Sequence, residues 1–332
     1  MLRFSSTLPF VLVLIATPTA FAQATPKAKA AAVKPSAELK RPAPTIADFK
    51  YGDDSPRQVL DLWQAKSDKP APFVLLIHSG SWKGRDKKAD FGDNDILPLL
   101  DAGISVAAIN YRFIQQGMEQ HVEPPVKACL YDAARALQTI RSKSKEWNLD
   151  PKRVGATGGS AGACTSLWLA LHDDLAKPNS KDPMERQSTR LTCAAVLAAQ
   201  TSLDPIQIRE WIPNAQYGGH AFGFSGPGRN RADEFALLLK NRESVLPWIK
   251  EYSPIEWVSK DDPPIYLDYP DQKQSPAKGQ KEPDPTHSAM YGVGLAERLE
   301  DAGVEVELAY PGHEDKKYGS INKFLISKLT AE

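Results

Sequence analysis

The chain has 332 residues, 25% of them charged, and a formal net charge of +0 at pH 7. Its Lys and Arg residues are spread along the sequence, which argues against nucleic acid or an anionic membrane surface as the partner. The length fits one domain preceded by a processed N-terminus.

Residues 1–22 have the order of a secretory signal peptide. MLRF is followed by an apolar run from Leu8 to Ile15 and by the small-residue site Ala20-Phe21-Ala22. The run is far short of the ~20 residues that a membrane-spanning helix needs. We therefore expect cleavage after Ala22 and a secreted or periplasmic protein that has no membrane association once the signal is removed.

Residues 23–45 consist largely of Ala, Lys and Pro, with almost no large apolar side chain. Such a segment buries too little surface to offset the entropy of ordering, so we expect a disordered tether. The catalytic domain is then expected over residues 46–332.

Beyond the tether, short apolar runs alternate with longer stretches of helical periodicity. This order predicts an α/β fold, with a mostly parallel central sheet and helices on both faces. Strands are predicted to start at Val59, Phe73, Ser105, Arg153, Ala194, Ile265 and Val304. Helices are predicted over 127–147, 161–172, 287–302 and 317–329.

Residues 203–262 break this alternation, with helical pieces around the Gly-rich segment GGHAFGFSGPG. An insertion of this size between two strands typically forms a lid or a binding wall. The three cysteines, Cys129, Cys164 and Cys193, lie among apolar or small residues, which favours buried thiols. The sequence permits one disulfide but does not require it.

The strongest local motif is Gly158-Gly159-Ser160-Ala161-Gly162, between the predicted strand RVGAT and a predicted helix. A G-x-S-x-G motif between a strand and a helix is typical of a nucleophile elbow, in which the serine side chain is exposed on a strained turn. Glycines on either side relieve the crowding of that turn. We therefore predict that Ser160 is a nucleophile.

A second motif, His78-Ser79-Gly80-Ser81-Trp82, follows the predicted strand FVLLIH. Acyl transfer needs backbone N–H groups aimed at the oxyanion that forms on the substrate. In nucleophile-elbow enzymes they come from this loop and from the residue after the nucleophile. We predict Gly80, Ser81 and Ala161 as the donors, with His78 shaping the loop through hydrogen bonds.

Together these segments resemble a known superfamily. HSGSW followed by KGRDK, then INYR, DAARAL and DPKRVGATGGSAG, resemble α/β-hydrolases of the acetyl-xylan/feruloyl-esterase-like and hormone-sensitive-lipase-like branches. YSPIEWVSKDDPPIYL is similar to the segment before the acid-bearing strand of those serine esterases, and AYPGHED to their histidine loop. The resemblance covers roughly residues 51–329 and implies a triad in the order Ser, acid, His.

His313 is the expected general base, because it follows the last predicted strand and precedes the final helix. His287, which begins a predicted helix after PDPT, is the alternative. His121, His172 and His220 have no comparable position.

The sequence indicates the acid of the triad less clearly than the nucleophile and the base. The related esterases end the matching strand in a His-Gly-x-x-Asp turn, whereas this chain has Tyr-Pro-Asp-Gln-Lys, with Lys273 at the position of the acid. We expect Asp271 to serve instead, with Asp268 and Asp284 as alternatives. If Asp284 is the acid, the polar loop 272–286 must fold back over the site and His287 becomes the rival base.

Trp82 and Trp211 are candidates for contact with the substrate, although core packing explains each equally well. No ligand spacing suggests a metal and no dinucleotide motif follows a first strand, so no cofactor is expected.

The sequence thus predicts a serine carboxylic-ester hydrolase for short-chain acyl or aryl esters, including acetylated or feruloylated carbohydrate. A non-catalytic binding protein on the same scaffold and a serine peptidase remain alternatives. The acyl group, the alcohol and the oligomeric state stay open.

Overall fold

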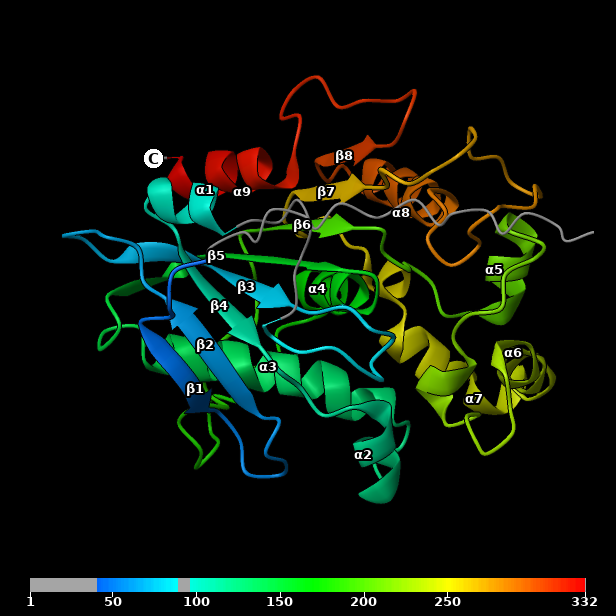
Figure 1. Cartoon of the computed structure of the whole chain (residues 1–332), viewed down its shortest axis with the longest axis horizontal. Helices are drawn as coiled ribbons and strands as arrows, with labels where there is room; N and C mark the ends of the chain where they lie inside the picture. The colour runs from blue at the N-terminus through cyan, green and yellow to red at the C-terminus, as the bar shows by residue number, and fades with distance from the viewer. Residues whose placement is uncertain (1–40, 89–95, 332) are drawn as a thin grey trace, which may run out of the picture. The chain divides into compact units, whose positions relative to one another are not determined.

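The computed structural model describes residues 41–88 and 96–331. The predicted signal peptide and most of the predicted tether lie outside the described residues. Within the described residues, eight strands form one sheet in the order β1-β2-β4-β3-β5-β6-β7-β8 (Figure 1). The strands are β1 Ile46–Lys50, β2 Val59–Trp63, β3 Ala71–Ile77, β4 Ser105–Ile109, β5 Leu149–Gly159, β6 Cys193–Leu197, β7 Ile265–Asp268 and β8 Val306–Ala309.

The sheet is mostly parallel, as predicted. The pairs β1·β2 and β2·β4 are antiparallel, and the other neighbours are parallel. All seven predicted strands are present, whereas β1 was not predicted. Its residues, IADFK, are half-buried or exposed at the edge of the sheet, so they lack the apolar signature of a buried strand.

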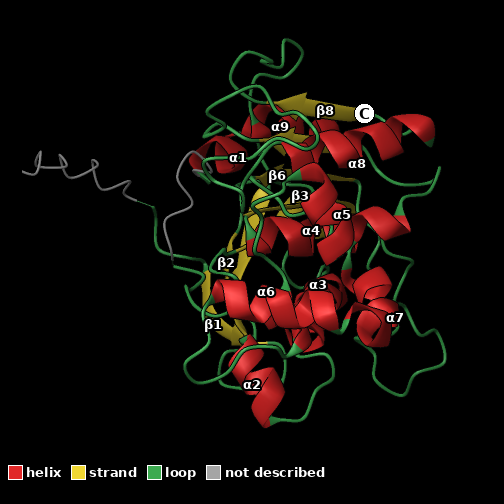
Figure 2. Ribbon diagram, turned by 90° about the vertical axis from the view of Figure 1, so that its right-hand side faces the viewer, coloured by secondary structure: helices red, strands yellow, loops and turns green. Residues whose placement is uncertain are grey.

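Helices cover both faces of the sheet (Figure 2). Successive strand residues point to opposite faces, so Phe73, Leu75 and Ile77 of β3 join one apolar core while Val74 and Leu76 join the other. The first core also contains residues of α3 Val126–Ser142, α4 Ala161–Leu171 and α8 Met290–Asp301. The second contains residues of α1 Leu97–Asp101 and α9 Ile321–Thr330. A further short helix, α2 Ile114–Glu119, precedes α3.

The helix α3 shows why these segments fold as they do. Its buried residues include Val126, Cys129, Ala133, Leu137 and Ile140, at the three- and four-residue spacing that forms one apolar face. The expectation of buried thiols is confirmed, because all three cysteines are buried and free. Among the described residues, no helix combines the length and the apolar character that crossing a membrane requires.

The segment between β6 and β7 is helical. It holds α5 Pro205–Trp211, η1 Gly219–Phe222, α6 Arg231–Lys240, α7 Arg242–Tyr252 and η2 Pro254–Trp257. These elements fall within the insertion predicted over 203–262. The Asp204 carboxylate caps α5 and binds Arg242 at the start of α7, which ties the two helices together. Asn230 and Asp233 form a capping box at the start of α6.

The described part of the loop after β3 is anchored by a buried lysine. The Nζ of Lys87 lies 2.7 Å from a carboxylate oxygen of Asp61 and 2.7 Å from one of Asp48. The Lys87 backbone N–H donates to the side chain of Asn110, 2.6 Å away. Because Lys87 and Asp61 are almost fully buried, removing either partner would leave an uncompensated charge in the interior.

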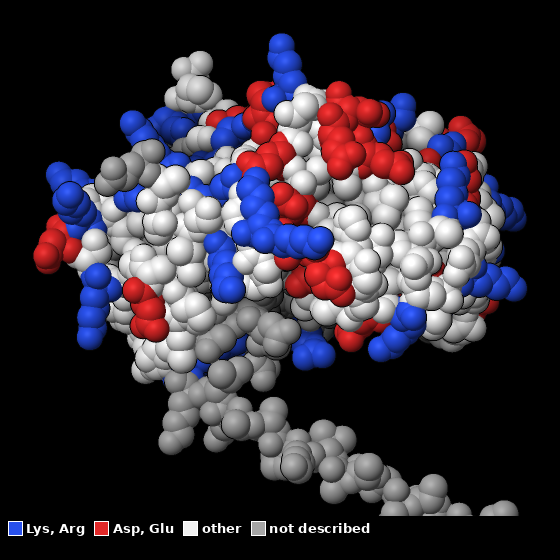
Figure 3. Space-filling view, turned by 90° about the horizontal axis from the view of Figure 1, so that it is seen from above, with Lys and Arg blue, Asp and Glu red and all other residues white. Residues whose placement is uncertain are grey.

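Charged side chains of both signs occur across the face shown in Figure 3. This distribution agrees with the scatter of Lys and Arg along the sequence.

Candidate active site

Ser160 lies on the turn between β5 and α4, at the carboxyl end of the parallel strands. Its backbone has φ 51° and ψ −117°, a conformation that is strained for any residue with a side chain. The Ser160 N–H donates to the carbonyl of Leu197, at the end of the neighbouring strand β6, over 2.9 Å. The predicted strand-turn-helix context of the serine is therefore present.

The turn packs against the end of β3 with no room for side chains. A Cβ added to Gly158 would lie 2.4 Å from the carbonyl oxygen of Ile77, and one added to Gly162 only 2.1 Å from it. The Gly162 Cβ would also lie 2.8 Å from the carbonyl oxygen of His78. Both outer glycines of the motif are thus required by the close approach of two backbone segments.

The same approach brings the loop after β3 beside Ser160. His78 is fully buried, stacks on Tyr111, and donates from Nδ1 to the carbonyl of Ser79, 2.8 Å away. Burial lowers the pKa of His78 to about 4, so the ring is neutral and its Nε2 can accept from Arg57. The prediction that His78 shapes this loop through hydrogen bonds is confirmed.

The three predicted oxyanion donors lie at this junction. Gly80 has φ +105° and Ser81 has φ 54°, so the loop turns sharply directly after His78 and Ser79. Ala161 is the first residue of α4, and its N–H has no acceptor within the helix. Their role as donors stays a prediction.

A chain of two hydrogen bonds links Ser160 to a histidine and an aspartate. The Oγ of Ser160 lies 3.1 Å from Nε2 of His287, and Nδ1 of His287 lies 2.8 Å from Oδ2 of Asp284. The order along the chain is Ser, Asp, His, which is the order expected for this fold. With Nδ1–H donating to Asp284, Nε2 is free to accept the Ser160 proton.

Asp284 is held in its ionised form. Burial by itself would raise its pKa, but the hydrogen bond and positive charge of His287 and the backbone N–H of Thr286 outweigh this effect and lower it. The Thr286 N–H donates to Oδ1 over 3.1 Å, while Oδ2 accepts from His287. The carboxylate therefore has one oxygen fixed by its own loop and one directed at the imidazole.

The loop after β7 folds back so that Asp284 and His287 reach Ser160. The side chain of Gln272, at the start of the loop, accepts from the Ala289 N–H over 2.9 Å and donates to Glu282 over 3.1 Å. From outside the loop, Gln200 donates to the carbonyl of Thr286 over 2.7 Å. These bonds close the loop on itself, as the alternative with Asp284 as the acid requires.

The structure does not place His313, the expected general base, beside Ser160. His313 lies on a tight turn after β8, where its backbone pairs with Tyr310 and its ring stacks on the Tyr310 ring at 5.0 Å. The residue is exposed. The strand β8 is at the edge of the sheet, three positions from β5, whereas β7 is closer and has the longer loop after it.

The structure does not bring Asp271, the expected acid, to His287 either, because the carboxylate that contacts His287 is Asp284. Asp271 is exposed at the start of the loop after β7, and so is Lys273. Gln272, between them, is the buried residue that holds the loop. At this position the chain has a side chain that closes the loop, and the carboxylate that contacts His287 is Asp284, later in the same loop.

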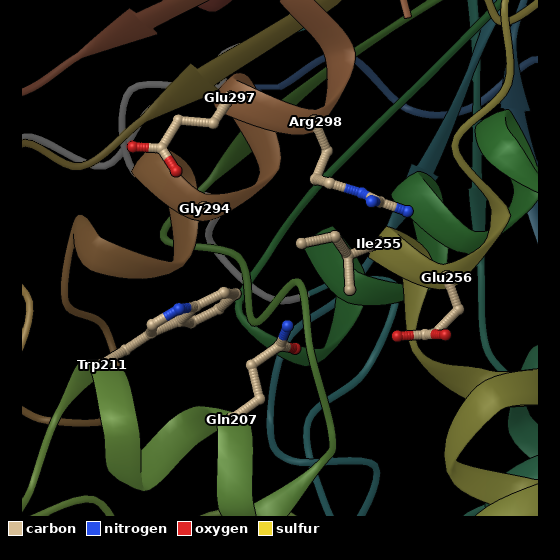
Figure 4. A pocket seen from close by; sticks show the side chains of 7 residues that line it. All are labelled: Gln207, Trp211, Ile255, Glu256, Gly294, Glu297 and Arg298. Atoms are coloured by element: carbon tan, nitrogen blue, oxygen red, sulfur yellow. The ribbon is translucent and has the colours of Figure 1, made fainter. Parts of the chain in front are cut away.

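Neither predicted aromatic contact is supported. Trp82 is fully buried in the core, and its indole N–H donates to Thr165 of α4 over 3.0 Å. This bond ties the loop after β3 to α4. Trp211 lines a cavity of about 300 Å³ between α5, η2 and α8 (Figure 4). The cavity is lined by Gln207, Trp211, Ile255, Glu256, Gly294, Glu297 and Arg298, a set without Ser160 or His287.

Comparison with known families identifies the family of this chain. The family model BD-FAE matches residues 60–275, which is more than half of the chain. The chain belongs to the BD-FAE family. The matched segment contains Ser160 and the loop after β3, and it ends before Asp284 and His287.

Two curated proteins match shorter segments. Acetylcholinesterase of Gallus gallus is 30% identical over 131 residues, which are 38% of this chain and 16% of that protein. The probable carboxylic ester hydrolase LipM of Mycobacterium tuberculosis is 27% identical over 151 residues, 44% of this chain and 32% of that protein. The chain therefore matches less than a third of the length of either relative.

One solved structure shows the fold over most of the BD-FAE chain. A truncated carbohydrate esterase from gut microbiota has a TM-score of 0.61 and 20% identity, and the match covers 86% of this chain and 96% of that one. At this identity the likeness supports the α/β-hydrolase fold alone.

We predict that Gly162→Ala destabilises this BD-FAE protein by about 1–3 kcal/mol, because the new Cβ forces the elbow away from Ile77. The matched control is Gly159→Ala, whose Cβ meets its nearest atoms at 3.9 Å. Urea unfolding of both variants measures the difference. Equal free energies of unfolding would show that the turn absorbs the extra methyl group.

Proposed function

We propose that this protein is a serine carboxylic-ester hydrolase that works through an acyl-enzyme on Ser160. The observation that carries the proposal is the hydrogen-bond chain from Ser160 through His287 to Asp284, on a strained turn. This arrangement activates a hydroxyl that is otherwise a weak nucleophile.

The proposed reaction has two steps. The Oγ of Ser160 attacks the ester carbonyl while Nε2 of His287 takes its proton; the imidazolium then returns that proton to the leaving alcohol. In the second step a water molecule, deprotonated by His287, attacks the acyl-enzyme and releases the carboxylic acid and Ser160. Asp284 fixes the imidazole tautomer and stabilises the imidazolium, and it stays ionised throughout.

The backbone N–H groups of Gly80, Ser81 and Ala161 are proposed to bind the oxyanion of both tetrahedral intermediates. The buried hydrogen bonds of His78 and Trp82 hold the loop that carries two of them. Such preorganised donors contribute on the order of 10²- to 10³-fold each to the turnover rate.

The proposed substrates are short-chain acyl or aryl esters, including acetylated or feruloylated carbohydrate. Names of similar proteins support this class, since LipM is described as a probable carboxylic ester hydrolase and the structural neighbour as a carbohydrate esterase. The complete hydrogen-bond chain on Ser160 counts against a non-catalytic binding protein. No feature of the described residues favours a serine peptidase.

We predict that Ser160→Ala abolishes hydrolysis of aryl acetates while the protein still unfolds cooperatively. The reason is that the hydroxyl takes part in the chemistry, while the turn itself is held by backbone contacts. Release of the phenol is followed by absorbance, and stability by urea unfolding. Wild-type rates in the variant would contradict the role of Ser160.

We predict that Asp284→Asn lowers kcat by up to about 10⁴-fold, because the amide supports the wrong imidazole tautomer. Asp271→Asn is the matched control, since that carboxylate is exposed on the same loop and should leave kcat near the wild-type value.

The same comparison separates the two histidines. His287→Gln should remove most activity, whereas His313→Gln should change kcat by less than about threefold. If kcat falls strongly in the His313 and Asp271 variants but not in the His287 and Asp284 variants, the assignment expected from the sequence is restored.

We also propose that the protein is secreted or periplasmic, with cleavage after Ala22. The support is the sequence of residues 1–22, which ends in Ala20-Phe21-Ala22. Mass spectrometry of protein from its native host should then find a mature chain that starts at Gln23. Mature protein that retains Met1 would contradict the proposal.

A further inference from the structure

Arg231 extends from the insertion between β6 and β7 to the loop that holds the base. It is the first residue of α6, and its Nη1 donates to Oγ1 of Thr286 over 3.2 Å. Thr286 directly precedes His287, whose Nε2 contacts Ser160. The guanidinium is therefore fixed one residue away from the proposed base.

The charge of Arg231 also acts toward the loop after β3. His220 and Tyr217, both buried, lie near enough for the Arg231 charge to act on them. Burial, with the positive charges of Lys83 and Arg231, lowers the pKa of His220 to about 3. The rings of His220 and Trp82 are 5.9 Å apart, and Glu234, on the same helix as Arg231, contacts Lys83, so this part of the insertion lies against the loop after β3.

The nearby carboxylates already have other partners. Glu234 accepts from Lys83 over 3.1 Å and from Ser225 over 2.8 Å, and its second oxygen lies 3.9 Å from His220. Asp284 accepts from His287. Asp233 accepts from the Asn230 N–H in the capping box. None of these acids forms an ion pair with Arg231 within the described part of the chain.

One edge of the Arg231 guanidinium remains available. Its only hydrogen bond to a described residue uses Nη1, so Nε and Nη2 form a fork with no protein acceptor there. This edge matches the spacing of two carboxylate oxygens, and such bidentate pairs are stronger and more selective than single hydrogen bonds. The residue is exposed, so a ligand can reach it.

We propose that Arg231 is a specificity-determining residue that binds a carboxylate on the ester substrate. The inference rests on the proposed ester hydrolysis and adds a substrate class: esters with an anionic carboxylate on the acyl or on the alcohol part. Arg231 binds this group through Nε and Nη2, and the charged fork itself makes the selection whether or not Nη1 contacts Thr286.

The test compares substrates that differ only in charge. For the acyl side, the pair is para-nitrophenyl hemisuccinate and the para-nitrophenyl ester of succinamic acid. For the alcohol side, the pair is para-acetoxybenzoate and para-acetoxybenzamide. The readout is the ratio of kcat/KM for the carboxylate over kcat/KM for the amide, because this ratio does not depend on the general activity of a variant.

In the wild type we expect a ratio above one for at least one pair, and that pair identifies the side that carries the carboxylate. Arg231→Gln should lower the ratio about 10- to 100-fold, the range expected for a lost charge-assisted hydrogen bond. Arg231→Lys, which keeps the charge but not the fork, should give an intermediate ratio.

Thr286→Val is the control for a purely structural role. It removes the contact between Arg231 and the loop but leaves the guanidinium, so the rates for both members of a pair should change together. The proposal is overturned if Arg231→Gln, like Thr286→Val, leaves the ratio unchanged, since Arg231 would then only hold the loop. A ratio that does not exceed one for either pair in the wild type would also overturn it.

The proposed ester hydrolysis and the proposed carboxylate preference can be disproved separately. If the wild type hydrolyses the amide-bearing esters but shows no dependence on Arg231, ester hydrolysis stands and only the carboxylate preference falls. If it hydrolyses none of the four esters, the proposed function fails and the inference falls with it.

Discussion

The carbonyl oxygen of Ile77 occupies the space that a Cβ on Gly158 or Gly162 would need, at 2.4 and 2.1 Å. This contact presses the end of β3 against the turn that carries Ser160. The loop to Gly80 leaves β3 at that point, so the spacing between nucleophile and predicted oxyanion donors is set by backbone packing. Backbone packing of this kind offers fewer alternative positions than side-chain contacts do, because it has no rotamers to exchange. The strained φ of 51° at Ser160 persists because both flanking segments are fixed.

Burial divides the histidines around the site into two groups. His78 and His220 have pKa values lowered to about 4 and 3, mainly by burial, so they are neutral over the physiological range and act as fixed hydrogen-bonding or packing groups. His287 is different, because its side chain is 35% exposed and touches an ionised carboxylate. Only this histidine contacts Ser160 within the described residues. The histidine proposed as the base is thus the one beside Ser160 that is partly exposed and hydrogen-bonded to a carboxylate.

The parts of the fold that follow from local signals could be predicted. Apolar runs predicted seven of the eight strands, and the G-x-S-x-G motif predicted the exposed serine on its turn, because each pattern reflects a local requirement of burial or backbone geometry. The proposed acid and base depend instead on the course of a long polar loop, which is decided by distant contacts such as the one between Gln272 and Ala289. One local signal was available: Asp284 and His287 are three residues apart, a spacing at which side chains in a turn can meet. His313 had the better position by analogy, but it lies after the edge strand.

The insertion between β6 and β7 contacts two loops of the candidate site. Helix α6 contacts the loop after β3 through Glu234 and Lys83, and the loop after β7 through Arg231 and Thr286. The first loop carries the predicted oxyanion donors and the second carries the proposed acid and base, so one helix contacts both parts of the candidate site. Acyl transfer needs the donors and the base placed around one tetrahedral intermediate, and contacts of α6 with both loops favour such a placement. Arg231 contacts the loop through Nη1 alone, and its Nε and Nη2 have no acceptor among the described residues. The same side chain can therefore contact the loop and also offer a charged edge to a substrate.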